Sequence, residues 1–340
     1  MEAKDFQALV EQLGELSSEQ RDALVEAVRR KSSVNDAIRM IETRFAAAPR
    51  CGHCHSEKVA TWAKTNPLTR YKCKACGKTF NALTGTPLAH LHRRDAWLKY
   101  AQALADGVSL RKAAKRCKIA LDTAFRWRHR FLTIPKDKKA TSISGIVEAD
   151  ETYVLKSQKG ARRVRGRAPR KRGGKAAKPG LSDEHTPVLI ARDRTGATTD
   201  AMLDKVDTEN IVRHLAPVVA KDTLLISDGE KAYGAFAAKQ GILHVWIIAS
   251  KGEHVWQGYH VQNVNAYTSG FKTWMVRFKG VATKYLASYL GWRRMIDRDG
   301  DDASAAHYLL AAIAWGATIK LNRASSNDMR GGSAFWSMGV

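Results

Sequence analysis

The organisation of this chain is clearest between His260 and Met295, which reads HVQNVNAYTSGFKTWMVRFKGVATKYLASYLGWRRM. Its apolar residues recur at helical spacing, which predicts a long helix with one buried face. The helix begins among three carboxamides, Gln262, Asn263 and Asn265, although a helix start needs only one capping side chain. Lys272 follows Asn265 by seven residues, almost two helical turns, so the two side chains lie on one face. We therefore expect this face to address a single ligand.

Two acidic segments upstream each place an aspartate near the end of an apolar, strand-like run. Asp150 lies in GIVEADETYV and Asp228 in TLLISDGEKAY. Three early strands, a helix, a strand, a helix, a strand and the long helix follow one another, which is the mixed α/β order of an RNase H-like core. In that order the two aspartates lie on adjacent strands, where they can hold two Mg²⁺ ions roughly 3.5–4 Å apart. Glu148 projects to the same side as Asp150 and is an auxiliary candidate, and Glu151 is a weaker one.

This core, the expected catalytic domain, occupies residues 141–325 after a polar linker at 134–140. Beyond its first strand, further strands are expected at 186–192, 198–203, 223–227 and 242–248, with helices at 207–221 and 233–240. A basic insert at 156–180 interrupts the domain. Between Lys156 and Lys178 it carries eleven Lys or Arg and no acid, the composition of a flexible loop that clamps a nucleic-acid backbone or of a merely solvated insert. The candidate DNA contacts here are Arg162, Arg163 and Arg170.

The composition points to a polyanionic partner. Lys and Arg number 57 against 33 Asp and Glu, a formal net charge of +24 in 340 residues. A membrane surface is the competing polyanion, but the best apolar run, 308–319, is too short to span a bilayer. The N-terminal MEAKDFQALV lacks the pattern of a secretory signal. Together with cysteines that suit metal binding better than disulfides, this predicts a cytoplasmic protein without membrane contact.

Four of the five cysteines form two CxxC pairs, Cys51–Cys54 and Cys73–Cys76, separated by 18 residues. Tetrahedral Zn²⁺ takes four thiolates at this spacing, so residues 46–90 are predicted to form a zinc ribbon. Residues 1–45 before it read as two or three short amphipathic helices, with Ser17 three positions ahead of Gln20 as a second helix start. The basic side chains of the ribbon fit phosphate contact or an ordinary solvated surface: Arg70, Lys72, Lys74 and Lys78.

A helix-turn-helix is predicted within residues 91–135. Residues 109–132 read SLRKAAKRCKIALDTAFRWRHRFL: Ser109 caps a first helix, a break covers 117–121, and a second helix starts at Asp122. Trp127 faces the core. An arginine-bearing second helix is typical of major-groove readers. The candidate DNA contacts share its outward face: Thr123, Arg126 and Arg130.

In this order, the motifs resemble bacterial insertion-sequence transposases of the ISXO type over about residues 15–315. The similar segments are the zinc ribbon, SLRKAA…TAFRWRHRFL, VEADETYV, SDG and HVQNVNAYTSGFKTWM…GVATKYLASYLGWRR. The resemblance implies an RNase H-like catalytic domain whose catalytic set is Asp150, Asp228, Asn265 and Lys272. Many relatives carry Glu in place of Asn265. Because an amide oxygen is a poorer Mg²⁺ ligand than a carboxylate, Glu253 is the alternative third ligand.

The resemblance also implies the roles of nearby side chains. Lys272 would bring a positive charge to the scissile or leaving phosphate without touching metal. His254 and His260 fit either an active-site contact or a capping role.

The function that these features predict is that of a DNA transposase. It would bind double-stranded terminal inverted repeats and perform Mg²⁺-dependent strand cleavage and transfer, with Mn²⁺ able to substitute. Joining two ends implies a homodimer or a larger synaptic complex, in a bacterial cytoplasm and in association with the nucleoid. One alternative is a non-catalytic, transposase-derived DNA-binding regulator. Another is a structure-selective nuclease of the same fold, which cuts and never joins.

Overall fold

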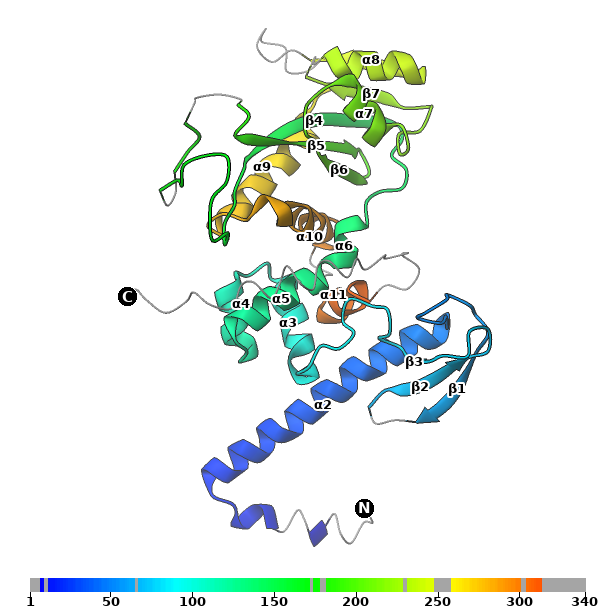
Figure 1. The fold of residues 1–340 in the computed structure, drawn as a ribbon, viewed down its shortest axis with the longest axis vertical. Helices are drawn as coiled ribbons and strands as arrows, with labels where there is room; N and C mark the ends of the chain where they lie inside the picture. The colour runs from blue at the N-terminus through cyan, green and yellow to red at the C-terminus, as the bar shows by residue number, and fades with distance from the viewer. Residues whose placement is uncertain are drawn as a thin grey trace. The chain divides into compact units, whose positions relative to one another are not determined.

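The structure is a computed structural model that describes residues 7–8, 12–64, 67–171, 174–177, 182–228, 231–247, 258–300 and 304–313. The chain divides into two compact units (Figure 1). The first comprises Met1–Gly107, Arg111–Phe131 and Ser304–Ala317; the second comprises Val108–Leu110, Leu132–Ala303 and Thr318–Val340. Ser304–Ala317 thus groups with the first unit, although the boundary expected at residue 325 assigns it to the catalytic domain.

The first unit begins with η1 (Leu13–Glu15) and the long helix α2 (Ser18–Ala47), so one continuous helix follows Ser17 where shorter ones were expected. The helix starts where the sequence predicts: Ser17 accepts a hydrogen bond from the Gln20 backbone N–H, and the Gln20 side chain accepts one from the Ser17 backbone. This reciprocal pair satisfies two donors that a helix start otherwise leaves unpaired. Near the other end of α2, the Glu42 carboxylate accepts from the Thr69 N–H at 2.9 Å and from the Tyr71 hydroxyl at 2.8 Å. These bonds fasten α2 to the sheet that follows.

That sheet is antiparallel, in the order β1-β2-β3, with β1 at Val59–Lys64, β2 at Thr69–Cys73 and β3 at Thr79–Asn81. The helical part of the unit contains η2 (Arg94–Ala96), α3 (Trp97–Ala105), α4 (Leu110–Cys117), α5 (Leu121–Phe131) and α11 (Ala305–Ala311). Tyr100, Trp127 and Phe131 pack ring against ring in its core. Helices α4 and α5 are the two helices expected, and the turn between them places Lys118 at φ 50°.

The second unit is built on one five-stranded sheet in the order β6-β5-β4-β7-β8. Strand β5 runs antiparallel to β4 and β6, whereas β7 runs parallel to β4 and to β8. This is the strand order and direction of an RNase H-like sheet, so the mixed α/β prediction is confirmed. The strands are β4 (Ile146–Leu155), β5 (His185–Asp193), β6 (Thr198–Met202), β7 (Leu224–Ser227) and β8 (Leu243–Trp246).

Helices cover both faces of this sheet (Figure 1). On one face, α7 (Thr208–Leu215) and α8 (Lys231–Gln240) bury a core that includes Val147 and Ala149 of β4. On the other, α9 (Gln262–Val276) contacts β4 and β5, and α10 (Leu286–Asp299) contacts β6. Since side chains alternate along a strand, Glu148 and Asp150 project toward the α9 side. The remaining elements are α6 (Thr133–Asp137) and η4 (Thr283–Tyr285).

Two predicted helices are shorter than expected. The helix predicted at 207–221 ends at Leu215, because Pro217 lacks the N–H that would continue the ladder, and Val219 instead pairs with Ile143. The long helix predicted to start near Asn263 is followed by a break, so the stretch up to Met295 contains two helices, α9 and α10. Lys279 and Gly280 adopt φ 54° and 87° between them, which an α-helix does not accommodate. Within the part of the chain that the structure describes, no helix is long and apolar enough to cross a bilayer.

Candidate active site and metal sites

Three carboxylates gather at one edge of the five-stranded sheet. Glu148 of β4 pairs with Ile226 of β7, so continuing this parallel register brings Asp150 opposite Asp228, just past the end of β7. Oxygen atoms of Asp150, Glu151 and Asp228 all lie within 4.8 Å of one another. The sequence predicts the two aspartates together, and the structure adds Glu151, which the sequence ranks lower. The group is compatible with a hard divalent cation such as Mg²⁺.

The electrostatics of this edge favour a cation. Burial raises the pKa of Asp150 to about 6, and the negative charge of Asp228 adds to the rise. The positive charge of Lys272 on α9 acts in the opposite direction and lowers the pKa of Asp150. Two carboxylates held this close repel each other unless a proton or a metal ion neutralises them. The residues present therefore fit Mg²⁺ by charge and by donor chemistry.

Glu151 is bound from the other side of the sheet. It accepts a hydrogen bond from the hydroxyl of Tyr233, a fully buried residue of α8. Burial and the Glu151 carboxylate raise the pKa of Tyr233 well above its ordinary value, so this hydroxyl stays protonated and remains a donor. Tyr233 thus connects the acidic edge to α8.

Glu148 holds the start of α9. Its side chain is completely buried, and its Oε2 accepts the Val264 backbone N–H at 2.9 Å. Its Oε1 lies 3.2 Å from a guanidinium nitrogen of Arg194 and 3.5 Å from Nδ1 of His260. A carboxylate at a helix N-terminus satisfies an unpaired N–H and interacts favourably with the helix dipole. Glu148 therefore positions α9 and is already engaged away from the aspartates.

Asn265 and Lys272 are both exposed on α9, as expected of one solvent-facing side. Asn265 follows directly after Val264, the residue whose N–H binds Glu148. Among the three carboxamides, Asn263 donates from Nδ2 to the Asp193 carbonyl at 3.3 Å, so it has a structural contact. The assignment of Asn265 as a ligand stays a prediction. Glu253 and His254 lie outside the described residues.

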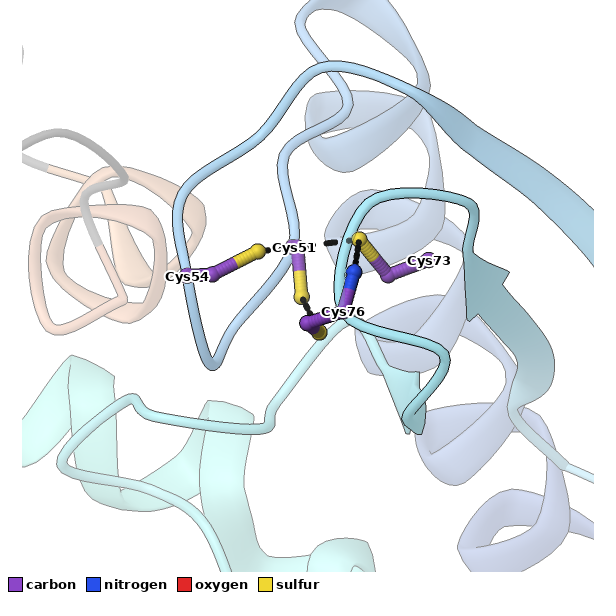
Figure 2. Close-up of side chains that lie close together, drawn as sticks. All are labelled: Cys51, Cys54, Cys73 and Cys76. Atoms are coloured by element: carbon purple, nitrogen blue, oxygen red, sulfur yellow. Dashed lines mark hydrogen bonds between the residues drawn. The ribbon is translucent and has the colours of Figure 1, made fainter.

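The four cysteines form a second cluster (Figure 2). Their sulfurs lie within 4.8 Å of one another, with Cys51 to Cys76 at 3.7 Å and Cys54 to Cys73 at 3.6 Å. A tetrahedron with metal–sulfur bonds of about 2.3 Å has sulfur–sulfur edges of about 3.8 Å, so this spacing is compatible with Zn²⁺. The four sulfur atoms are therefore close enough to bind one metal ion together.

Backbone donors already face these sulfurs. The N–H groups of Cys76 and Ala75 donate to the Cys73 sulfur and lower the pKa of this thiol to about 6. For Cys54 a backbone hydrogen bond from Ser56 acts in the same direction, but burial and the neighbouring thiols outweigh it and raise the pKa to about 12. Four thiolates at this separation require a cation, since the first to ionise opposes the others.

The predicted DNA-contact residues of α5 differ in what they already bind. Arg126 is exposed and forms an ion pair with Asp122 at 2.7 Å, while Thr123 is half-buried. Arg130 donates to the backbone carbonyls of Pro87 and, at 2.8 Å, of Ala89. Its guanidinium thus braces the preceding loop. Of the three, Arg126 is the side chain best placed to meet a ligand.

The basic insert is held at its base. Arg170 pairs with Glu184 and donates to the Lys156 carbonyl at 2.7 Å, whereas Arg162 and Arg163 are exposed. Arg170 also lowers the pKa of Glu184, which keeps the carboxylate charged. Patterns of charge alone do not separate such a bracing arginine from exposed ones.

A lysine of the insert reaches the turn after α9. Lys159 Nζ donates to the carbonyls of Phe278, Lys279 and Gly280 at 3.3, 3.0 and 2.9 Å. The backbone of Ser157 exchanges hydrogen bonds with Thr283 beside it, at 2.8 and 2.9 Å. No sequence signal predicts these contacts, nor those of Arg194, because each joins segments far apart in the chain.

Comparison with known proteins bears on the same segments. Residues 142–293, which include both aspartates, Asn265 and Lys272, match the family model described as the ISXO2-like transposase domain. A protein of Halobacterium salinarum, described as an uncharacterized protein in transposable element ISH50, is 27% identical over 255 residues, which cover 74% of this chain and 86% of that protein. A chain from the crystal structure of a pre-cleavage Mos1 transpososome matches with 12% identity and a TM-score of 0.21, covering 63% of this chain and 77% of that chain.

Proposed function

We propose that this protein binds the terminal inverted repeats of an insertion sequence and cuts and joins DNA strands there, a proposal supported by the match of residues 142–293 to the ISXO2-like transposase domain. The observation that supports this most is the placement of Asp150 and Asp228 at one sheet edge, with oxygens within 4.8 Å of each other. Paired carboxylates of this kind serve phosphoryl transfer, for which the barrier is lowered mainly by charge neutralisation and positioning.

Asp150 and Asp228, with the side-chain oxygen of Asn265, would hold Mg²⁺ at this edge. When bound, the metal supplies activation of a water or a 3′-hydroxyl and stabilisation of the leaving oxygen, and Mn²⁺ can substitute for it. Glu148 fixes the first turn of α9, so the orientation of Asn265 follows from a buried contact. Glu151, held by Tyr233, is a further oxygen donor in the same group.

Lys272 provides the positive charge that faces the phosphate. Its charge lowers the pKa of Asp150, and its side chain is exposed, so it can approach a phosphate without displacing core residues. A positioned donor to developing negative charge is worth on the order of 3 kcal/mol of barrier.

Three elements would bind the DNA. The four cysteines would hold one structural Zn²⁺ and so stabilise the ribbon. Arg126 of α5, and Thr123 where α5 approaches the bases, would read the major groove, while Arg130 supports the loop that precedes the helix. Arg162 and Arg163 of the insert would contact the backbone of double-stranded DNA through charge, with Arg170 holding the base of the insert.

The proposed reaction also implies an oligomeric state and a cellular location for the protein. Joining two transposon ends requires two active sites, so the working form would be a homodimer or a larger synaptic complex. Its substrate, chromosomal DNA, places it with the nucleoid in the cytoplasm.

A cleavage assay tests this function. Purified protein is incubated with duplexes that carry the inverted repeat, with Mg²⁺, Mn²⁺ or EDTA, and with a target plasmid. The expected result is metal-dependent cutting at the repeat and joined products. Binding of the repeat without cutting in either metal would instead indicate a regulator, and cutting without joining would indicate a nuclease.

A further inference from the structure

The three-stranded sheet of the first unit has two faces with different roles. Tyr71 and Phe80 point toward α2, where their rings lie 4.7 and 6.1 Å from that of Phe45. Because side chains alternate along a strand, Arg70 and Lys72, the neighbours of Tyr71, project from the opposite face. This outer face is therefore not part of the packing against α2.

Trp62 lies on the outer face at an irregularity of the edge strand. The pairing of β1 with β2 passes from Thr61 to Ala63, which leaves Trp62 as the extra residue of a β-bulge. Bulges re-aim side chains, and this indole is 57% exposed. Lys72 Nζ lies 4.3 Å from the centre of the indole ring. Since the indole remains largely in water, its contribution to folding is small and calls for another explanation.

The charge of this face is uniform. The Arg70 guanidinium donates to the Thr79 hydroxyl at 2.9 Å, which holds it across the sheet. The three strands as described contain neither Asp nor Glu. The indole of Trp62 thus lies on the same face as two cationic side chains, and the strand residues include no acid. We call these residues the Trp62 face: Trp62, Arg70, Lys72 and Thr79.

We propose that the Trp62 face binds unpaired nucleotides of DNA, with a base stacked on Trp62 and the adjoining phosphates at Arg70 and Lys72. The two cations match phosphates, and the indole matches the flat surface of a base, which neighbouring bases cover inside a duplex. A second copy of this chain is a poorer occupant, because the same cations would meet each other in a protein of net charge +24. The inference rests on the proposed function, since a protein that cuts and joins strands encounters nucleotides without their pairing partner.

The test uses the full-length protein and measures fluorescence anisotropy with a labelled single-stranded oligonucleotide and with its duplex. Trp62→Ala should weaken single-strand binding about tenfold, the loss expected for one base–aromatic stack, and should change duplex binding by less than about twofold. Trp62→Phe keeps a ring and should stay within about threefold of the natural protein. Lys221→Ala is the charge control, because Lys221 is exposed, lies in the second unit and is outside the Trp62 face.

Several results would overturn the inference. One is a Trp62→Ala protein that binds the single strand as tightly as the natural one. Another is an equal loss in Lys221→Ala, which would show that overall charge, and not the Trp62 face, sets the affinity. A changed oligomeric state in Trp62→Ala with unaltered single-strand affinity would identify a protein contact instead. Zinc content and thermal unfolding, measured on each variant, establish that it is folded. Failure of the proposed transposase function can be told apart from failure of this inference. A protein without transposase activity could still lose single-strand affinity in Trp62→Ala.

Discussion

The four-cysteine cluster and the acidic edge of the sheet are both groups of metal-binding side chains, yet they relate to the fold in opposite ways. In the first, two tight turns bring four sulfurs together, and backbone N–H groups already donate to Cys51 and Cys73. In the second, burial and a like charge raise the pKa of Asp150 to about 6, so ionising this site costs stability. The first arrangement can therefore stabilise the fold when it holds a metal ion, whereas the second lowers the stability of the fold when both carboxylates are ionised.

The largest expected effect is the loss of a cysteine from the cluster. Cys73→Ser should release zinc and lower the free energy of unfolding by on the order of 5 kcal/mol, out of the roughly 10–16 kcal/mol that a structural zinc contributes. Metal analysis and denaturant titration measure both quantities. Cys117→Ser is the control, because Cys117 is equally buried but lies in α4, outside the cluster. If both variants kept their zinc and unfolded alike, the first half of the comparison would be wrong.

Substitution at the acidic edge should raise the free energy of unfolding, whereas substitution in the cysteine cluster lowers it. Asp150→Asn should reduce strand cleavage by at least about a thousandfold, because one metal-holding carboxylate is lost, and leave binding of the repeat unchanged. The folded pKa of about 6 exceeds the unfolded value of 3.8, so the natural protein loses stability as pH rises from about 4 to 6. Without metal at pH 7, Asp150→Asn should therefore be more stable by on the order of 2 kcal/mol.

Thermal unfolding in EDTA as a function of pH measures this gain. Asp204→Asn is the matched control, because Asp204 is exposed in the loop after β6. An Asp150→Asn protein that is less stable than the natural one at every pH would show that this aspartate supports the fold.

Asn265 comes next in magnitude. Asn265→Ala should slow cleavage by about 10²–10³, whereas Asn265→Asp restores an oxygen donor with an added charge and should keep measurable activity with an altered Mg²⁺ or Mn²⁺ requirement. Single-turnover cleavage at varied metal concentration separates the two variants. Native-rate cutting by Asn265→Ala together with an inactive Glu253→Ala would transfer the ligand role to Glu253.

Glu148 tests whether a positioning contact can be separated from the chemistry. Glu148→Ala should cost about 3 kcal/mol of stability, because the Val264 N–H and the Arg194 guanidinium lose a buried partner. Glu148→Gln keeps an acceptor for the Val264 N–H, so it should recover part of that stability and of the cleavage rate. The apparent Mg²⁺ requirement should rise in both. Unchanged metal dependence in a folded Glu148→Ala protein would show that the contact does not bear on the active site.

The smallest effect is expected at Arg126. Arg126→Ala should cost about 1–3 kcal/mol of binding to the repeat and relax its sequence preference. The loss is smaller by a few tenths of a kcal/mol, because in the protein without DNA Arg126 already forms an ion pair with Asp122. Arg162→Ala is the charge-matched control and should weaken binding to all duplexes alike. Competition binding with repeat and random DNA measures the difference. Equal discrimination by both variants would remove α5 from the recognition surface.

Much of the acidic edge and the cysteine cluster could be predicted because each rests on local patterns. CxxC spacing is a property of one turn, and Asp150 and Asp228 each follow an apolar run whose strand character is short-range. The strand order then followed from the sequence of strands and helices. The two aspartates could be predicted to lie together because the alternation of strands and helices is visible in the sequence.

The residues that the sequence did not distinguish are those whose role is set by a distant partner. Arg170 and Arg130 look like other arginines of basic segments, but both are engaged by backbone carbonyls. In the sequence Glu148 resembles any acid near Asp150, and only the structure shows that it accepts a hydrogen bond from the first turn of α9. The break after Val276 was missed for the same reason, since apolar spacing continues through a turn that Lys159 stabilises.

Helix α9 is supported at its two ends by charges from other parts of the chain. Its own first turn contains no acid, its last turn no base, and its N-cap residue forms no side-chain capping bond. Glu148 of β4 serves the beginning, and Lys159 serves the carbonyls just past the end. Such a helix is marginal alone, so its stability depends on the sheet and the insert that supply these two contacts. Lys272 can therefore face the two aspartates only within the folded domain, and a truncation that removed β4 or the basic insert would also remove the support of the helix that carries it.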